Sequence, residues 1–367
     1  MDAARRVAQE VLAPAAEATD RAPLVPGGHL RALAAAGLLG LAGPADAGGA
    51  AAGPAVTRAV YESLAGACGV TFFVWVQHHA PVRLLAASAN GTLRRHWLAP
   101  LCRGDVLGGV AFAYLRRPGP TAVLARPAPG GWVVSGEAPW VTSWGLAGLF
   151  AVAARVAVEP ATGRDDDDGD VLFFVLAADP PLAAVRASPP LALAAMGASS
   201  TVRLSFDDLF VPSGDVVTTL PFSTWRERDR TATSLPHPAP FGVASAAVRL
   251  LADHAEATDQ PAAAEAASRL AGELDECRAH SYHLVDAGGT DAARPVALVE
   301  ARAWGLDLAM RSAQALVVAV GGRAMALGHP AQRLLREAAF YSIQAQSLPL
   351  RQATLARVTR RQGAPSS

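Results

Sequence analysis

Hydrophobic residues recur with helical spacing over the first hundred positions of the chain. Within residues 5–19, Val7, Val11, Leu12 and Ala15 fall on one face of a predicted helix. The later run 70–76 is rich in β-branched and aromatic residues, which favour a strand, yet it lies among helical patterns that favour a helix. Further helices are predicted at 29–37, 56–67 and 93–101.

The spacing changes near residue 106. Short runs of β-branched and aromatic residues follow, separated by turn signals such as Pro118-Gly119-Pro120 and Pro129-Gly130-Gly131. Because no helical pattern alternates with them, they predict an antiparallel β-barrel or sandwich. The predicted strands are 106–114, 122–126, 132–135, 150–158, 171–177 and 201–206.

Helical spacing returns at about residue 239, in segments dominated by alanine, as a close-packed helix bundle allows. The pattern predicts an α+β fold with three domains: an N-terminal helical domain at 1–105, a β-domain at 106–220 and a C-terminal helical bundle at 221–367. The helices predicted in the last domain are 240–258, 261–286, 293–318 and 331–361.

Composition narrows the classes of partner. Lys and Arg balance Asp and Glu at 32 each, so no basic surface predicts nucleic acid binding. Three widely spaced cysteines fit free thiols in a reducing cytoplasm, and no apolar run approaches the ~18 residues of a membrane span. The four aspartates 165–168 lack the alternation of a calcium loop, which favours a solvated hairpin tip and no metal site.

Five segments, in order, resemble sequence motifs of the acyl-CoA dehydrogenase superfamily. They are Ala36–Leu41 with Gly48-Gly49, Trp97–Leu101, Gly131–Gly136 with Trp140–Ser143, Met196–Pro212, and Gly321-Gly322 with Arg333–Ala338. The resemblance covers nearly the whole chain. It implies the three-part fold of that family, with FAD between the β-domain and the C-terminal bundle and with subunits that pair to complete the site.

The same resemblance assigns residues to the flavin site. Trp140 and Thr142 match the Trp and Thr that flank the isoalloxazine ring, and Ser143 ends that motif. Gly321 and Gly322 match a pair at which the backbone passes close to the cofactor, which glycine permits because it has no Cβ. Ser347 matches a hydroxyl residue that bonds the flavin.

Three departures from the family pattern weaken the site. The loop that contacts FAD and substrate is replaced by 111–120, and the phosphate-binding arginine has no counterpart in 255–261. The catalytic glutamate falls on Ala345, whose methyl group cannot take a proton, so the catalytic residue is unknown. Glu227, Asp229 and His237 lie near a second family position for the base, and we expect them to be exposed loop residues.

Three hypotheses follow. The first is an FAD-dependent oxidoreductase acting on the CH–CH group of an acyl-CoA or acyl-carrier-protein thioester, with a non-standard or missing base. The alternatives are a flavin-dependent monooxygenase and a catalytically silent binding or partner subunit. The family also implies an electron-transfer partner and a homodimer or homotetramer, and the apolar residues within 297–320 predict a subunit interface.

Overall fold

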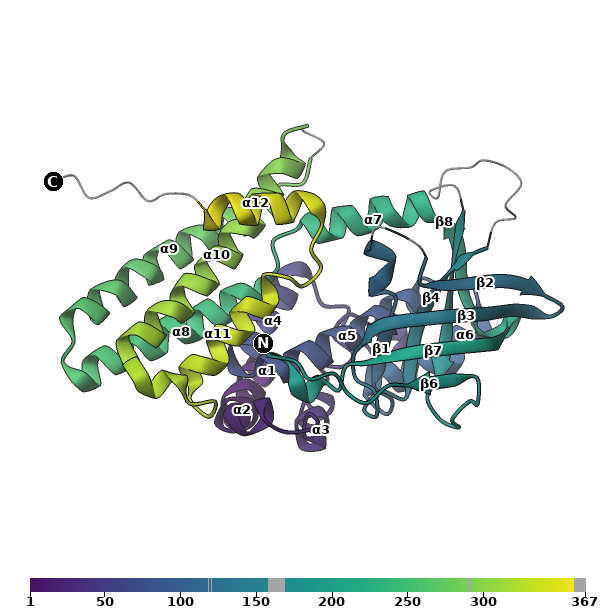
Figure 1. Ribbon diagram of the computed structural model, residues 1–367, viewed down its shortest axis with the longest axis horizontal. Coiled ribbons are helices and arrows are strands. Elements are labelled where there is room, and N and C mark those ends of the chain that lie inside the picture. Colours follow the sequence, from purple (N-terminus) through teal and green to yellow (C-terminus); the bar gives the residue numbers. More distant parts are fainter. Residues whose placement is uncertain (118, 120, 158–168, 290–291, 360–367) are drawn as a thin grey trace.

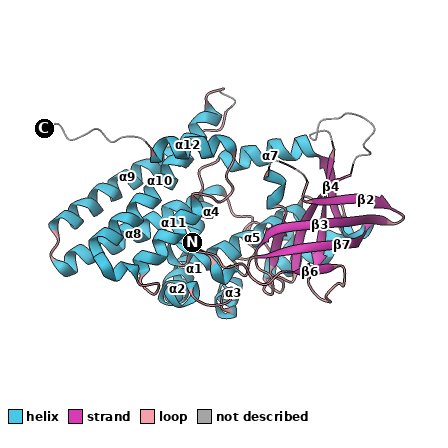
Figure 2. Ribbon diagram, in the orientation of Figure 1, coloured by secondary structure: helices cyan, strands magenta, loops and turns pink. Residues whose placement is uncertain are grey.

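The computed structural model describes residues 1–117, 119, 121–157, 169–289 and 292–359. Helices form one end of the elongated molecule and strands the other (Figure 1). Figure 2 shows that the N-terminal and C-terminal helices lie together, although the whole sheet separates them in the sequence. The aspartates 165–168 lie outside the described residues.

The first hundred residues are helical, as the spacing predicts. The ambiguous run 70–76 is helical too, because Phe72, Val74 and Trp75 point to different sides of the helix and are all buried. The elements are α1 (Asp2–Arg6), the π-helical turn η1 (Val7–Leu12), α2 (Ala13–Asp20), α3 (Gly27–Ala35), the 3₁₀ turn η2 (Ala45–Ala47), α4 (Pro54–Ala67), α5 (Gly69–Ala86) and α6 (Gly91–Arg103).

The central region is one eight-stranded, mostly antiparallel sheet in the order β6-β7-β3-β2-β4-β5-β8, with β1 added beside β4. The pairings β1–β4 and β2–β4 are parallel, which the antiparallel prediction did not include. The strands are β1 (Gly108–Ala111), β2 (Val123–Ala128), β3 (Gly131–Val141), β4 (Leu149–Val156), β5 (Asp170–Ala177), β6 (Val185–Ala187), β7 (Val202–Pro212) and β8 (Val216–Pro221).

The strands differ from the sequence prediction in several places, and β3 and β7 extend beyond their predicted ends at 135 and 206. The short strands β6 and β8 were not predicted, and the strand predicted at 106–114 stops at Ala111. A 3₁₀ turn, η3 (Ala113–Arg116), follows it. Two further 3₁₀ turns, η5 (Gly197–Ser199) and η6 (Ser213–Asp215), flank β7.

The C-terminal region contains one helix more than predicted at each end of the bundle. Residues 222–234 are helical rather than a loop, and the helix predicted at 331–361 is broken at 342–347. The prolines at 236 and 238 separate the first two helices. The elements are α7 (Phe222–Ser234), α8 (Pro238–Thr258), α9 (Pro261–Asp286), α10 (Arg294–Val320), the 3₁₀ turn η7 (Gly321–Met325), α11 (Pro330–Tyr341) and α12 (Leu348–Val358).

Two hydrophobic cores divide the molecule. The N-terminal helices and the C-terminal bundle share one core, and the sheet with α6 has the other. Helix α5 belongs to both, because Phe72 and Trp75 lie in the helical core while Val82 and Leu85 lie in the sheet core. This helix therefore fixes the sheet relative to the bundle.

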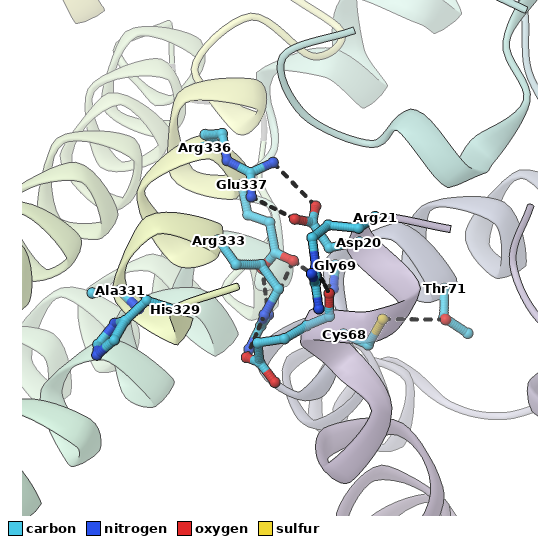
Figure 3. A network of polar contacts seen from close by, with 11 residues as sticks. Asp20, Arg21, Cys68, Gly69, Thr71, His329, Ala331, Arg333, Arg336 and Glu337 are labelled. Carbon is cyan, nitrogen blue, oxygen red and sulfur yellow. Dashed lines mark hydrogen bonds and ion pairs between the residues drawn. The ribbon is translucent and has the colours of Figure 1, made fainter. Parts of the chain in front are cut away.

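A buried polar network fastens α11 to the N-terminal helices (Figure 3). The side chain of Glu337, only 2% exposed, accepts the Gly69 N–H at 3.1 Å and two hydrogen bonds from Arg333 at 3.0 Å. Arg333 also donates to Glu17 at 3.0 Å, and Arg336 pairs with Asp20. Because Glu337 caps the N-terminus of α5, the network ties the C-terminal bundle to the helix that carries the sheet.

Candidate functional site

The end of β3 presents an aromatic side chain on a strained turn. The pairing of β3 with β7 shifts register between Ala138 and Val141, so Trp140 lies on a bulge. Its φ is +62° and its side chain is 48% exposed. A large aromatic residue in the left-handed region is costly, and such strain concentrates where a side chain is held toward a ligand.

Buried hydroxyls lie directly behind this turn. The Thr142 hydroxyl is 3.4 Å from that of Thr201, which lies 2.8 Å from the Ser199 hydroxyl. Ser143, also at positive φ, is completely buried, and its Oγ has no hydrogen-bond partner among the described residues. The Thr142 hydroxyl is thus held within the protein, whereas the Ser143 hydroxyl is the one without a partner.

The segment that carries Ala345 is held in place by a buried arginine. Arg302 of α10, 6% exposed, donates to the carbonyls of Thr233 and, at 3.1 Å, of Gln344. Burial, together with the nearby charge of Arg116, lowers the pKa of Arg302 to about 10, so it stays charged at neutral pH. Ala345 itself has φ +50°, and its N–H donates to no described residue.

A cavity of about 570 Å³ opens between η3, α7 and the start of α12. Asp229 is the one carboxylate among its described lining residues, and Arg116 holds it through a two-pronged ion pair with contacts of 2.7 and 2.8 Å. Phe222 and Trp225 add a parallel ring stack, 5.4 Å between centroids. Six arginines line the cavity: Arg116, Arg117, Arg155, Arg226, Arg230 and Arg351.

The residues that the sequence assigned to a flavin lie on or beside three different elements. Ser347 lines the arginine cavity and caps α12, while Trp140, Thr142 and Ser143 belong to the β3 turn. Gly321 and Gly322 are exposed where α10 ends, and Gly321 adopts φ +71°, a conformation that glycine tolerates best. A helix end alone explains Gly321, so its contact with a cofactor stays a prediction.

The sequence predicted that the three alternative bases are exposed loop residues, and the structure corrects this prediction for each of them. Glu227 and Asp229 lie on α7, and only Glu227 is fully exposed. His237 caps α8 by accepting the Ala239 N–H at 3.2 Å, and burial lowers its pKa to about 3. Its ring also contacts those of Tyr61 and Phe72.

Sequence reasoning missed the arginine cavity. The pair Arg116-Arg117 interrupts an expected motif, and the Arg-x-Arg spacing of α7 repeats at 226, 228 and 230, but neither signal shows that the two segments meet. Their meeting with Arg351 depends on how α12 folds back after the break at 342–347. No cluster of His, Cys, Asp and Glu able to hold a metal occurs in the part of the chain that the structure describes.

Comparisons with known proteins show that this fold is similar to that of the acyl-CoA dehydrogenases and that part of the sequence matches them. The family described as "Acyl-CoA dehydrogenase, N-terminal domain" matches residues 1–105. Benzylmalonyl-CoA dehydrogenase of Aromatoleum aromaticum is 26% identical over 217 residues, which are 58% of this chain and 54% of that protein. The chain thus matches about half the length of this relative.

Solved structures share the fold over nearly the whole chain. Butyryl-CoA dehydrogenase from Megasphaera elsdenii has a TM-score of 0.77 at 17% identity, covering 98% of this chain and 97% of that one. Dibenzothiophene monooxygenase from Paenibacillus has a TM-score of 0.78 at 16% identity, covering 100% and 98%. The N-terminal residues 1–105 thus match the acyl-CoA dehydrogenase family, and the chain as a whole shares the fold of these solved structures.

Two features of the described residues would suit a flavin. Trp140 offers an aromatic face on a turn whose strain the surrounding strands impose, and the unpartnered Ser143 hydroxyl lies beside it. The arginines that line the cavity supply positive charge suited to the phosphates of a nucleotide cofactor.

Proposed function

We propose that the protein is an FAD-dependent oxidoreductase that binds an acyl thioester, on coenzyme A or a carrier protein, and acts on its CH–CH group. The match of residues 1–105 to the acyl-CoA dehydrogenase N-terminal domain and the similarity to benzylmalonyl-CoA dehydrogenase support the reaction class. The N–H of Ala345, which no described residue accepts, is the observation that carries the substrate class. An N–H aimed at a thioester carbonyl stabilises the enolate that forms when the α-proton leaves.

A bound flavin would supply the acceptor for the hydride, while the protein's own residues bind and orient. In this proposal Trp140 shields one face of the ring from water, and the buried Thr142 and Ser143 support the turn that holds it. Arg302 holds the carbonyl of Gln344, and so fixes the direction of the Ala345 N–H. The three-domain division at residues 105 and 220 and the roles of Gly321, Gly322 and Ser347 are parts of this proposal.

No residue at the aligned position takes the α-proton, because Ala345 has a methyl group there. Asp229, the one carboxylate among the described residues of the cavity, accepts hydrogen bonds from Arg116 on both oxygens, so Arg116 already occupies it. We therefore propose that proton transfer is slow in this protein when a thioester is the substrate.

The same missing carboxylate favours a second candidate, a flavin-dependent monooxygenase. Such a reaction needs no base at the α-carbon of a thioester, and dibenzothiophene monooxygenase shares the fold. The electron source would then be a partner that supplies reduced flavin.

The proposed location is the cytoplasm. Three free cysteines, all buried, accord with this location, which the sequence favours.

An anaerobic titration separates the candidates. FAD-reconstituted protein is mixed with a panel of acyl-CoA thioesters, and flavin absorbance is followed. Slow bleaching by a subset of thioesters supports the dehydrogenase reading. No spectral change with any thioester, combined with oxygenation of an added substrate when reduced flavin and oxygen are supplied, supports the monooxygenase. A protein that retains no flavin supports the binding subunit.

A further inference from the structure

Three arginines of the cavity have no ion-pair partner among the described residues. Arg117 follows η3, Arg230 lies on α7 and Arg351 on α12, so three separate segments bring them to one 570 Å³ space. Among the other three arginines of the cavity, Arg116 is paired with Asp229. Converging like charges repel, so the arrangement is favourable when an anion is bound between them.

The charge and shape of the lining select the kind of anion. A single carboxylate engages one guanidinium, whereas a diphosphate offers several oxygens to three guanidinium groups, each of which can donate two parallel hydrogen bonds. The wall also carries the Phe222–Trp225 ring stack, with the Arg155 guanidinium 3.6 Å from the Phe222 centroid. Aromatic and arginine planes are surfaces on which nucleotide rings stack.

We propose that this cavity binds the diphosphate of a nucleotide, with Arg117, Arg230 and Arg351 as its ligands. The inference rests on the proposed function in one respect, since that function supplies two such molecules, FAD and coenzyme A. These arginines, of which Arg117 lies within the segment 111–120 itself, would take over the phosphate contacts of the family motifs that are missing at 111–120 and 255–261. The volume suits the nucleotide part of either molecule.

The test uses the full-length protein and isothermal titration with ADP, FAD, coenzyme A and riboflavin. Arg117→Ala and Arg230→Ala should each weaken ADP binding about 10-fold or more, because each removes charge-assisted hydrogen bonds to phosphate. Riboflavin, which has no phosphate, should bind all variants equally. Arg269→Ala, which removes an exposed arginine on α9, should bind ADP like the wild type. All three side chains are solvent-accessible, so thermal unfolding should stay unchanged.

The titrations with FAD and coenzyme A show which of the two molecules places its diphosphate in the cavity. If FAD binding falls with ADP binding while coenzyme A binding does not, the cavity holds the flavin nucleotide, and the reverse pattern assigns it to coenzyme A. Equal binding of ADP, FAD and coenzyme A by the wild type and by Arg117→Ala and Arg230→Ala overturns the inference. In that case retained FAD would leave the proposed function standing. A wild type that binds ADP through these arginines but no flavin would instead contradict the proposed function alone.

Discussion

Trp140 combines a strained backbone with an exposed aromatic side chain, and both are unfavourable for stability. It follows a proline, lies on a bulge, has φ +62° and exposes about half of a side chain that is usually well buried. Strand pairing on both sides of the bulge compensates for that strain. A residue kept in this state fits a role in binding a planar ligand.

Replacing Trp140 tests that role. We predict that Trp140→Ala weakens FAD binding about 10- to 100-fold, since stacking on an aromatic side chain contributes roughly 1–3 kcal/mol. Equilibrium dialysis of FAD against the purified variant measures it. Trp132→Ala, in the same strand, is the control, and FAD binding to Trp140→Ala at wild-type strength would show that the turn is not part of the flavin site.

Two glycines in helices differ in the space around them, because only one of them contacts a segment far away in the sequence. A Cβ built on Gly69 would lie 2.5 Å from Cδ of Glu337, so this position has no room for alanine. Gly272, in the middle of α9, has nothing within 4 Å of such an atom. The two positions look alike in the sequence, since both are glycines in helical segments.

The elements are joined by the network around Glu337, and Gly69→Ala tests it. We predict that the free energy of unfolding falls by about 1–3 kcal/mol, because the new methyl group displaces Glu337 from the α5 N-terminus and from Arg333. Gly272→Ala should instead raise stability by roughly 0.5–1 kcal/mol, since alanine favours the helix. Urea denaturation measures both, and equal effects would contradict the assigned network.

The sequence predicts elements well where spacing repeats and less well where long-range contacts decide. Helices α8, α9 and α10 lie close to their predicted bounds because their apolar positions recur over many turns. Strands β6 and β8 are short and half-exposed, so they show little alternation. The break at 342–347 contains neither proline nor glycine, and Arg302, distant in the sequence, supports it by binding the Gln344 carbonyl.

In the candidate site, too, the sequence reveals local motifs but not contacts between distant segments. The motif at Trp140–Ser143 was recognisable because it is contiguous, and its exposed tryptophan and unpartnered serine are consistent with the predicted role. The cavity arginines come from segments more than a hundred residues apart, and no local pattern pairs Arg117 with Arg230 or Arg351. Charge convergence of this kind is visible only in the folded chain.

At the scale of the whole molecule, buried histidines link stability to pH. His78 joins the N-terminal region to the sheet, with Nε2 at 3.0 Å from the Leu39 carbonyl and Nδ1 accepting the Gly108 N–H at 2.8 Å. Burial lowers the pKa of His78 to about 4 and that of His237 to about 3, from 6.5. In the unfolded chain both rings take a proton at about pH 6.5, whereas the folded protein keeps them neutral.

Stability should therefore be fully present above about pH 6.5 and fall as the pH drops toward 4. At pH 5 each histidine costs about 2 kcal/mol, from 1.5 pH units at 1.36 kcal/mol each. The free energy of unfolding measured by urea at several pH values checks this. His78→Gln keeps one donor and one acceptor, so it should reduce the slope between pH 6.5 and 5, and an unchanged slope would contradict the assignment.

Assembly also belongs to this scale. The leucines at 306, 308 and 316, whose apolar character predicted an interface, are buried within the chain, so that argument no longer holds for them. Exposed apolar residues remain on the C-terminal bundle, including Val318 at 74%, Leu355 and Val358.

No helix of the described residues is long and apolar enough to cross a membrane.

We predict a dimer or a dimer of dimers that covers these side chains. Light scattering at micromolar concentration measures the mass, and Val318→Asp should shift the protein toward the monomer. A wild type with only monomer mass would exclude a subunit interface under these conditions.

The central proposal is that this protein binds flavin and thioester but lacks a base at residue 345. Ala345→Glu tests it most directly, with Ala345→Gln as the matched control of nearly equal size. Alanine already has φ +50° at this position, so glutamate and glutamine enter the same backbone conformation. Both variants also retain the N–H, which the proposal directs at the thioester carbonyl.

The measurement is the rate of anaerobic flavin reduction by acyl-CoA in the wild type and both variants, after binding of FAD and thioester has been shown. Because a positioned base contributes about 10²- to 10⁴-fold, Ala345→Glu should exceed the wild type by a factor in that range, while Ala345→Gln stays at the wild-type rate. Reduction by the wild type as fast as by Ala345→Glu, or background rates in Ala345→Glu with both ligands bound, would contradict the account.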